Sequence, residues 1–312
     1  MTNKEKNFAS AVIYIHNAEK QIGAFLDMII RTMEDNFEHS EIICVNDFSD
    51  DSSLSVIREK SKHASATSVS VINMSYFHGL ELAMSAGTDL SIGDFIFEFD
   101  NTIPDFDPAM IMKIYKHSLK GFDIVSAAPD RAARLSSKFF YQIFEHYSDQ
   151  NYKMTTESFR VLSRRAMNRV ASMNKTVLYR KAIYANCGLK IDTLKYIPVE
   201  KVRQNYDYQE NEYRTHLAGD ALILFTKMGY SFSKAMTALM MAVSLFMVGY
   251  SVVIYLTSNP IEGWTTTILF LSVAFFGLFG VLTVIIKYLQ LIIDLVFKRR
   301  HYSFESIEKL TK

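Results

Sequence analysis

The chain has 312 residues, 49% of them hydrophobic, and a formal net charge of +1 at pH 7. This length allows one substantial domain plus a second region, and the near-neutral charge gives no reason to expect a nucleic-acid partner. Cys44 and Cys187 lie far apart in apolar surroundings, which favours reduced thiols in a cytosolic domain over a disulfide framework. The first ten residues are polar, so we expect no secretory signal peptide.

The first 130 residues alternate between short β-rich runs and helical patterns. We predict strands at 11–15, 41–45, 69–73, 95–99 and 122–126, and helices at 19–36, 51–62, 79–91 and 107–119. This alternation predicts right-handed crossovers and an α/β fold, with a mostly parallel sheet covered by helices on both faces. Ligands of such sheets bind beyond the carboxyl ends of the strands.

Acidic and small polar residues follow three of the predicted strands, as "HNAE" at 16–19, "NDFSDDS" at 46–52 and "DNT" at 100–102. Asp50 or Asp51 can equally be a cap of the helix that follows. Asp47 and Asp100 come directly at strand ends, which favours a functional role over a structural one for both. The absence of a GxGxxG or Walker loop argues against a dinucleotide or ATP site.

The last third of the chain contains two long uncharged runs, Ala235–Leu256 and Trp264–Ile286. At about 1.5 Å per residue, each is long enough to cross a hydrocarbon core of about 30 Å. Two buried core helices are the alternative, but uncharged segments of this length are rare in soluble cores. We therefore predict two transmembrane helices within a region at 235–297.

The charges that flank these runs predict their orientation. Lysines precede the first run, "KRR" at 298–300 follows the second, and the connecting loop at 257–263 has neither Lys nor Arg. The positive-inside rule then places both termini in the cytoplasm, as in an integral protein of the inner (plasma) membrane. We expect a soluble domain at 1–215, a juxtamembrane amphipathic segment at 216–234 and a cytoplasmic tail at 298–312.

Taken in order, these segments resemble the family-2 inverting glycosyltransferases with the GT-A fold, and within them the membrane-anchored polyprenyl-phosphate glycosyltransferases. "AVIYIHNAEKQI" resembles the family's first strand and its Pro-x-Tyr-Asn-Glu turn, and "VNDFSDDS" resembles its Asp-Asp-x-Ser-x-Asp loop. "SYFHGLELAMSAGTDLSIGD" resembles the stretch before the metal motif, and "ESFRVLSRRAMNRV" the segment that carries Asp-Phe-Arg. The two uncharged runs complete the layout of this subgroup.

The resemblance implies a nucleotide-sugar donor of the UDP or GDP type. Asp47 would then read the base, in a nucleotide site that also includes Ile15, His16, Glu19 and Ser49. Asp100 and Thr102, in the Asp-x-Asp position, would hold Mg²⁺ or Mn²⁺ against the diphosphate, because oxygen ligands suit these hard cations.

The resemblance further implies a polyprenyl phosphate as acceptor and leaves a homo-oligomer open. Glu157 or Ser158 would lie at the reacting centre, and Arg160 would hold the acceptor phosphate by forked hydrogen bonds, as would Arg164 unless it lies on a solvated helix face.

Several positions depart from the family pattern. The turn reads Tyr14-Ile15-His16-Asn17-Ala18 and lacks its glutamate unless Glu19 substitutes, and Asp-x-Asp has become Asp100-Asn101-Thr102. Ser158 stands where Asp-Phe-Arg has its acid. The main expectation is therefore an enzyme that moves a sugar to a polyprenyl phosphate, and the alternative is a membrane-anchored binding or scaffold protein that has lost the chemistry.

Overall fold

In a computed structural model of the chain, the residues described are 4–130, 156–173, 179–185, 187–199 and 302–311, with isolated positions at 142 and between 212 and 292. The chain forms two compact units. Unit 1 comprises Met1–Glu145, Gln150–Ala218 and Arg300–Lys312, and unit 2 comprises His146–Asp149 and Gly219–Arg299. Unit 1 contains all of the strands described below.

The strands of unit 1 are β1 (Ala9–Ile15), β2 (Ser40–Asn46), β3 (Ser68–Met74), β4 (Phe95–Phe99), β5 (Ile124–Pro129), β6 (Phe159–Ser163), β7 (Ile191–Tyr196) and β8 (Phe304–Lys309). The helices are α1 (Ile22–Asn36), α2 (Ser53–Lys60), the 3₁₀ turn η1 (Ser61–His63), α3 (Leu80–Leu90), α4 (Ala109–Ser118), α6 (Arg164–Ser172) and α7 (Arg180–Ala185).

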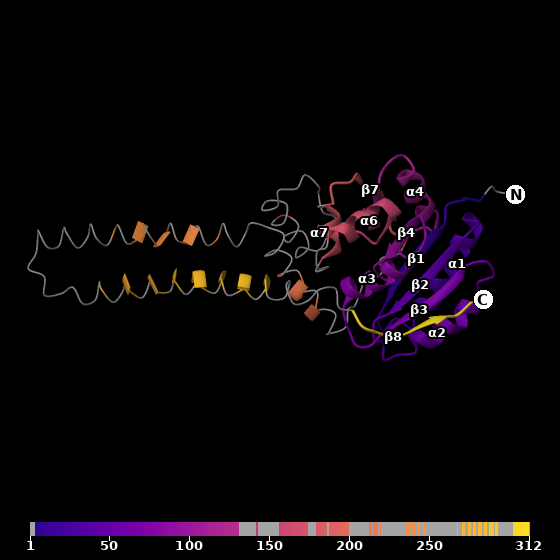
Figure 1. Ribbon diagram of the computed structural model, residues 1–312, viewed down its shortest axis with the longest axis horizontal. Helices are drawn as coiled ribbons and strands as arrows, with labels where there is room; N and C mark the ends of the chain where they lie inside the picture. The colour runs from indigo at the N-terminus through magenta and orange to yellow at the C-terminus, as the bar shows by residue number, and fades with distance from the viewer. Residues whose placement is uncertain are drawn as a thin grey trace, which may run out of the picture. The chain divides into compact units, whose positions relative to one another are not determined.

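These strands form one sheet in the order β7-β5-β6-β4-β1-β2-β3-β8 (Figure 1). All neighbours pair in parallel except at β6, which is antiparallel to both β4 and β5, and at β8, which is antiparallel to β3. The predicted mostly parallel α/β sheet is therefore confirmed. The five predicted strands correspond to β1–β5, and the four predicted helices to α1–α4.

Helices cover both faces of the sheet, and side-chain alternation along the strands explains how. On β1, Ala11 and Ile13 face a core that includes side chains of α1 and α4, whereas Val12 and Tyr14 face a core that includes side chains of α3 and α6. Because successive side chains of a strand point to opposite faces, a strand buried on both sides must be apolar throughout. The sequence "ASAVIYI" meets this requirement and is buried along its whole length.

The C-terminal segment differs from its prediction. The sequence suggests a cytoplasmic tail at 298–312, but Phe304–Lys309 forms β8 and closes the β3 edge of the sheet. Glu308 of β8 also forms a forked ion pair with Arg58 of α2, with the closest N–O distance at 2.8 Å. The end of the chain is therefore part of the domain formed by its beginning.

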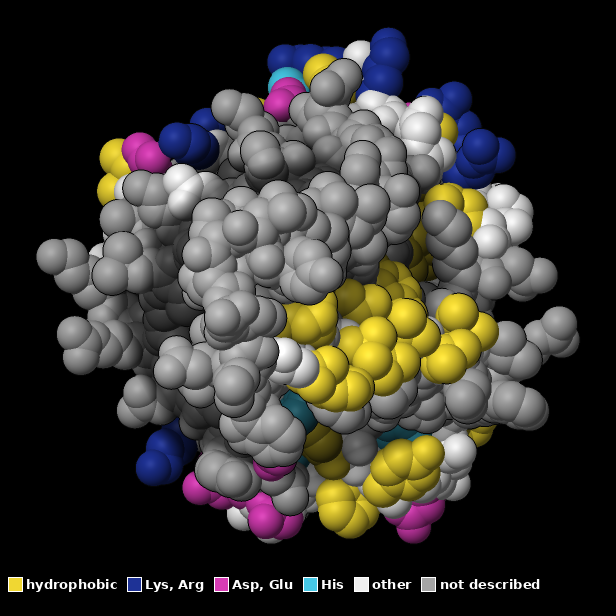
Figure 2. All heavy atoms as spheres, turned by 90° about the vertical axis from the view of Figure 1, so that its left-hand side faces the viewer, with side chains coloured by type: hydrophobic (Ala, Val, Ile, Leu, Met, Phe, Trp, Pro, Cys, Tyr) yellow, Lys and Arg dark blue, Asp and Glu magenta, His cyan; other side chains and the backbone are white. Residues whose placement is uncertain are grey.

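The two predicted membrane spans fall on stretches of unit 2 in which only isolated positions are described. Among the described parts of the chain, no helix has the length and apolar character needed to span a membrane. Figure 2 shows hydrophobic side chains gathered on one face of the molecule. The described positions of these two stretches with large exposed apolar side chains are Leu239, Phe246, Leu271, Phe275, Leu278, Leu282 and Ile285. The spans themselves stay a prediction.

Candidate functional site

Two turns at the carboxyl edge of the sheet, after β1 and β2, are bound tightly to each other. Backbone N–H groups of one turn donate to side chains of the other, with distances of 2.9–3.2 Å, in the pairs Asn17 to Ser49, Ala18 to Ser53, Glu19 to Asp51, Asp50 to Asn17 and Ser52 to Glu19. Asp51 also accepts from the N–H of Ser53, the first residue of α2, as the capping alternative predicts. Glu19 and Ser49, both predicted to bind nucleotide, thus shape the turns.

Asp47 ends the second of these strands, but its side chain points inward and is completely buried. Its carboxylate accepts from the backbone N–H groups of His78 and Gly79, at 2.9 and 2.8 Å, and from the Tyr14 hydroxyl at 3.1 Å. Burial raises the pKa of Asp47, and these donors oppose the rise. This placement does not fit the predicted contact with a base. Asp47 holds the turn between β3 and α3 instead.

Ile15 and His16 also lie beside Asp47. The backbone oxygen of Ile15 accepts from the N–H of Asp47 at 2.8 Å, and the Ile15 side chain is buried. His16 donates from Nδ1 to the Asp47 carbonyl at 2.7 Å, because a carbonyl oxygen can only accept. Its other ring nitrogen, Nε2, is buried without a hydrogen-bond partner, and its ring lies 4.8 Å from that of Phe77.

Two residues of these turns have left-handed backbones, Asn17 at φ 46° and Phe48 at φ 55°. Asn tolerates this region, but a bulky aromatic residue there costs about 1–2 kcal/mol. The Phe48 ring is nevertheless 56% exposed, and Tyr76, at the end of the neighbouring strand, is 54% exposed and stacks on His78. The carboxyl edge therefore presents two aromatic rings to solvent, one of them on a strained backbone.

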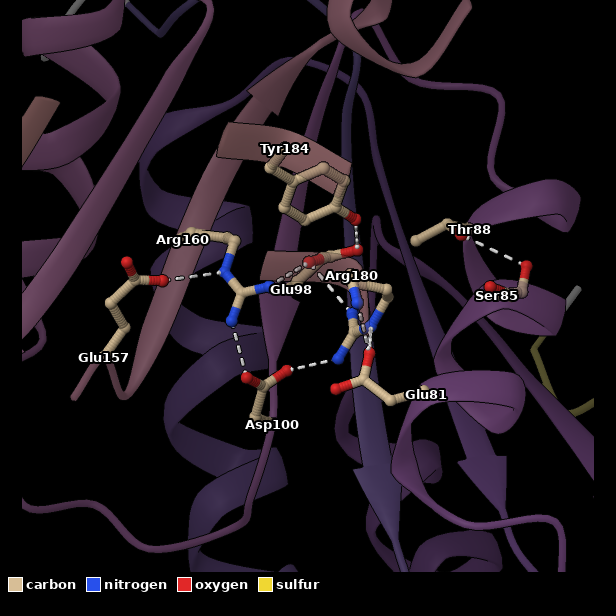
Figure 3. Close-up of polar contacts among 9 residues, drawn as sticks. All are labelled: Glu81, Ser85, Thr88, Glu98, Asp100, Glu157, Arg160, Arg180 and Tyr184. Carbon is tan, nitrogen blue, oxygen red and sulfur yellow. Dashed lines mark hydrogen bonds and ion pairs between the residues drawn. The ribbon is translucent and has the colours of Figure 1, made fainter. Parts of the chain in front are cut away.

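A network of buried charges lies next to these turns, on the face of the sheet covered by α3, α6 and α7 (Figure 3). Glu98 of β4 is directly opposite Arg160 of β6 in the antiparallel register, and Glu98 Oε2 lies 3.0 Å from Arg160 Nη1. Arg180 of α7 approaches the same oxygen at 2.9 Å, and Tyr184 donates to Oε1 at 2.7 Å. Opposite charges at this spacing offset part of the cost of burial.

Asp100 lies two residues beyond Glu98, on the same face, and both of its oxygens contact arginine. Oδ2 accepts from Arg160 at 2.6 Å and Oδ1 accepts from Arg180 at 2.7 Å. Burial alone would raise the pKa of Asp100, but these two guanidinium groups outweigh it and hold the pKa well below its ordinary value. Asp100 is therefore a carboxylate anchored by two cations.

These residues do not fit the predicted metal site. A divalent cation at Asp100 would lie within a few ångströms of two guanidinium groups, which repel it. Thr102 offers only a neutral hydroxyl, which lies 3.4 Å from Gln21 Oε1. Within the described ranges, no three His, Cys, Asp or Glu side chains are grouped so as to hold an ion. The predicted metal site and the structure disagree because Arg160 and Arg180 occupy both oxygens of Asp100.

Glu157 and Ser158, the residues predicted at the reacting centre, have different partners. Glu157 Oε2 lies 3.3 Å from Arg160 Nε, so this acid belongs to the charge network. The Ser158 hydroxyl lies 2.6 Å from the Tyr196 hydroxyl, which donates to Asp105 at 2.8 Å. The structure thus brings Asp100, Glu157 and Arg160 together and separates Ser158 from their charges.

The two predicted arginines lie in different surroundings. Arg160 is 1% exposed and surrounded by carboxylates, so its predicted contact with an acceptor phosphate does not fit this arrangement. Arg164 donates to the backbone oxygens of Ser91 and Gly93, just after the end of α3. Arg164 therefore fastens the start of α6 to the loop between α3 and β4.

Four residues of the network were missed by the sequence reasoning. Glu98 carries a signal, because it is the one charge within an apolar strand. Glu81 lies in the stretch that resembles the family's segment before the metal motif, but Arg180 and Tyr184 carry no signal. Arg180 donates from Nε to Glu81 at 2.8 Å, across 99 positions of sequence, and only the packing of α7 against α3 brings this pair together.

Two hollows among the described residues can be compared with the site. The larger, about 920 Å³, is a groove between α1 and α4 lined by residues such as Met28, Arg31 and Met112. It includes none of the turn or network residues, so we do not assign it to the site. The smaller, about 200 Å³, lies between α3, α6 and α7 and is lined in part by Arg164, Arg180 and Tyr184.

Comparison with known proteins explains this arrangement of elements. The sequence model of glycosyl transferase family 2 matches residues 10–174, which is more than half of the chain. The chain belongs to glycosyltransferase family 2. The match begins in β1 and ends just after α6, so it includes both turns and most of the charge network, and it confirms the family resemblance seen in the sequence.

Relatives of this family 2 chain are distant in sequence. Glycosyltransferase YkcC of Bacillus subtilis is 23% identical over 268 residues, which cover 83% of the chain and 81% of the relative. A prophage bactoprenol glucosyl transferase homolog of Escherichia coli is 26% identical, over 62% of the chain and 64% of the relative. The chain spans only 58% of the length of another similar glycosyltransferase, from Synechocystis.

Among solved structures, a mannosyltransferase from Pyrobaculum calidifontis, in complex with GDP-Man and Mn²⁺, resembles the chain with a TM-score of 0.50. The alignment covers 89% of this chain and 88% of the mannosyltransferase at 13% identity. At this identity the likeness shows the fold alone, which is of the GT-A type.

We expect Mn²⁺ alone to show no saturable binding to the purified chain, because Asp100 is already paired with two cations. Electron paramagnetic resonance of free Mn²⁺ during a protein titration measures this directly. Saturable binding that disappears in Asp100→Asn would contradict the assignment of Asp100 to the arginine network.

We expect Asp100 to contribute to stability in a pH-dependent way. A carboxylate whose pKa is depressed by folding stabilises the native state above its unfolded pKa of about 3.9, and this contribution is lost as pH falls below that value. The free energy of unfolding should therefore fall less steeply between about pH 5 and pH 3 in Asp100→Asn than in the wild type. Chemical denaturation at a series of pH values measures both slopes, and equal slopes would refute the pairing.

Proposed function

We propose that this chain transfers a sugar from a nucleotide-sugar donor of the UDP or GDP type to a polyprenyl phosphate at a membrane. The observation that carries the proposal is the family 2 match over residues 10–174, together with relatives named as bactoprenol glucosyl transferases. A further relative, from Aeromonas hydrophila, is named as an undecaprenyl-phosphate 4-deoxy-4-formamido-L-arabinose transferase. Each of these names describes the transfer of a sugar and includes a polyprenol or its phosphate.

The donor would bind at the carboxyl edge of the sheet, over the joined turns after β1 and β2. Exposed aromatic rings at such an edge suit a nucleobase, because every base has a face that stacks on them. Phe48 and Tyr76 are exposed there, and the strain at Phe48 is the kind of local cost that functional sites retain. We therefore assign the base contact to these rings rather than to the buried Asp47.

The reaction would be a direct displacement. An oxygen of the polyprenyl phosphate attacks the anomeric carbon, the bond from that carbon to the donor phosphate oxygen breaks, and the nucleoside diphosphate leaves with the electron pair, which inverts the anomeric configuration. The acceptor is already an anion, so it needs no strong base. Asp100 and Glu157 would lie near the reacting centre. Arg160 contacts both acids and Arg180 contacts Asp100, and these ion pairs would hold the acids in place. The proposal includes no step at a metal.

The predicted spans would keep the enzyme close to a lipid acceptor, which raises the effective concentration of two partners confined to one surface. Exposed Phe246, Phe275 and Leu282, which lie in the two uncharged runs, support this part of the proposal, because large exposed apolar side chains are typical of contact surfaces. The charge asymmetry of the flanks would then place the GT-A domain on the cytoplasmic side of the plasma membrane.

A second candidate function is a binding or scaffold protein with the fold but without the chemistry. One observation favours it: Asp47 and Asp100, the two acids at the family's motif positions, are both engaged in internal contacts. Such a protein would bind a nucleotide and transfer nothing.

A transfer assay separates the two candidates. Membranes that contain the full chain are incubated with radiolabelled UDP- and GDP-sugars and a polyprenyl phosphate, and the lipid phase is extracted and counted. We expect label in the lipid and a loss of at least about tenfold in Asp100→Asn, because this change breaks the ion pairs that orient Arg160 and Arg180. We expect no change in Lys190→Ala, whose exposed side chain lies between α7 and β7. Nucleotide binding without labelled lipid, from any common donor, would favour the scaffold.

Replacement of Phe48 by glycine should separate stability from binding. Glycine relieves the left-handed strain, so we expect the free energy of unfolding to stay level or rise by up to about 1 kcal/mol, while loss of the ring weakens UDP or GDP binding by roughly tenfold, the value of one stacking contact. Chemical denaturation and calorimetry measure the two effects. Unchanged nucleotide affinity would remove Phe48 from the proposed base contact.

A further inference from the structure

The turn from Ser75 to Gly79 joins β3 to α3 and holds Asp47. Backbone N–H groups of His78 and Gly79 both donate to the Asp47 carboxylate. The turn also carries Tyr76, one of the two exposed rings, and Phe77, which packs on His16. The position of this turn therefore determines where Tyr76 lies in the proposed donor site.

The segment that precedes β8 forms hydrogen bonds with this turn at Ser75 and at His78. The N–H of Ser75 donates to the Ser303 carbonyl at 3.0 Å, and the N–H of Ser303 donates to Nε2 of the His78 ring at 3.1 Å. Nδ1 of the same ring lies 2.5 Å from the Tyr76 carbonyl, so Nδ1 carries the proton and Nε2 is the acceptor. Each polar group of Ser303's backbone is thus used to hold the turn.

Tyr213 approaches the turn from a different part of the chain. A Cβ atom added to Gly79 would lie 2.3 Å from a carbon of the Tyr213 ring, and the centroid of that ring lies 6.0 Å from that of Phe77. Gly79 also has φ +79°, a conformation that favours glycine. The Tyr213 ring therefore rests on the bare backbone of Gly79, where no side chain other than hydrogen fits.

Tyr213 and Ser303 belong to unit 1, and they lie in sequence just before and just after Gly219–Arg299, the main segment of unit 2. The chain that leads into that segment and the chain that returns from it both contact the same five-residue turn. Other contacts fasten the returning chain, since Tyr302 donates to Asp89 of α3 at 2.9 Å and Asn73 of β3 donates to Ser306 at 3.0 Å.

We propose that His78 is a positioning residue for the donor site, and that it and Tyr213 make nucleotide binding depend on how the two chain segments that flank residues 219–299 are docked. The proposal rests on the proposed function only for the location of the donor site. Coupling of this kind is reciprocal, so a bound nucleotide must in turn stabilise the docking of both segments.

The first test replaces His78 by phenylalanine in the full chain. Phenylalanine keeps the backbone N–H that reaches Asp47 and a ring that can stack on Tyr76, but it removes both the acceptor of the Ser303 N–H and the donor to the Tyr76 carbonyl. We expect UDP or GDP to bind roughly fivefold more weakly, because the turn loses hydrogen bonds on both sides of the ring. Tyr213→Leu should weaken binding similarly, and the double variant should lose less than the product of the two, because both changes release the same turn.

Arg58→Gln is the matched control. It removes an exposed ion pair to Glu308 of the same C-terminal strand but leaves Ser303, His78 and Tyr213 untouched. We expect its nucleotide affinity to equal that of the wild type. An equal loss in Arg58→Gln would show that general loosening of β8 accounts for the effect, and unchanged affinity in both His78→Phe and Tyr213→Leu would overturn the proposal.

Hydrogen exchange on the wild-type chain tests the reciprocal effect and does not depend on how a variant folds. Saturating UDP or GDP should slow amide exchange in 75–79 and in 302–309 together, and protection of the first segment without the second would also overturn the proposal. The two proposals fail separately. Coupled protection without sugar transfer to lipid removes the enzymatic function alone, whereas transfer with no effect of His78→Phe and Tyr213→Leu removes the coupling alone.

Discussion

The arrangement of unit 1 depends on the pairing of buried charges on the face of the sheet covered by α3, α6 and α7. Glu98 is fully buried in the middle of the sheet, where an unpaired carboxylate would cost several kcal/mol. Its antiparallel neighbour Arg160 satisfies part of this requirement, and Arg180 and Tyr184 of α7, a helix remote in sequence, add to it. β4, β6 and α7 must therefore pack together, and the insertion of an antiparallel β6 between two parallel strands is what places Arg160 opposite Glu98.

The same constraint determines what Asp100 does. In the side-chain alternation of the strand it follows Glu98 on the same face, so it reaches the two arginines that Glu98 has already recruited. The sequence departs from the family pattern at the neighbouring position, where Thr102 replaces an acid. Asp100 shares two guanidinium groups with other carboxylates of the network, and Thr102 offers only a neutral hydroxyl. This electrostatic environment differs from that of a pair of acids open to a metal. This change gives a physical reason for the mismatch between the inherited fold and the predicted metal site.

The carboxyl edge of the sheet shows a similar division of roles. Polar groups of the turns after β1 and β2 bond to one another, and these bonds fix the turns. Two aromatic residues at this edge, Phe48 and Tyr76, are exposed. A rigid polar frame that displays apolar rings is suited to a planar ligand, and the third turn of this frame is held in place by Ser303 and Tyr213, from segments that flank the predicted membrane region.

The sequence by itself determined the order of strands and helices through residue 130, because period-two and period-3.6 apolar patterns depend only on local geometry. It also determined the family, since the short motifs occur in the right order although no single one is intact. It placed Asp47 and Asp100 correctly at strand ends. It did not determine the direction of their side chains, because that depends on which donors the rest of the chain brings near. Arg180, Ser303 and Tyr213 come from 80 or more positions away in sequence, and only tertiary packing decided that two acids at ligand-binding positions are held inside the protein.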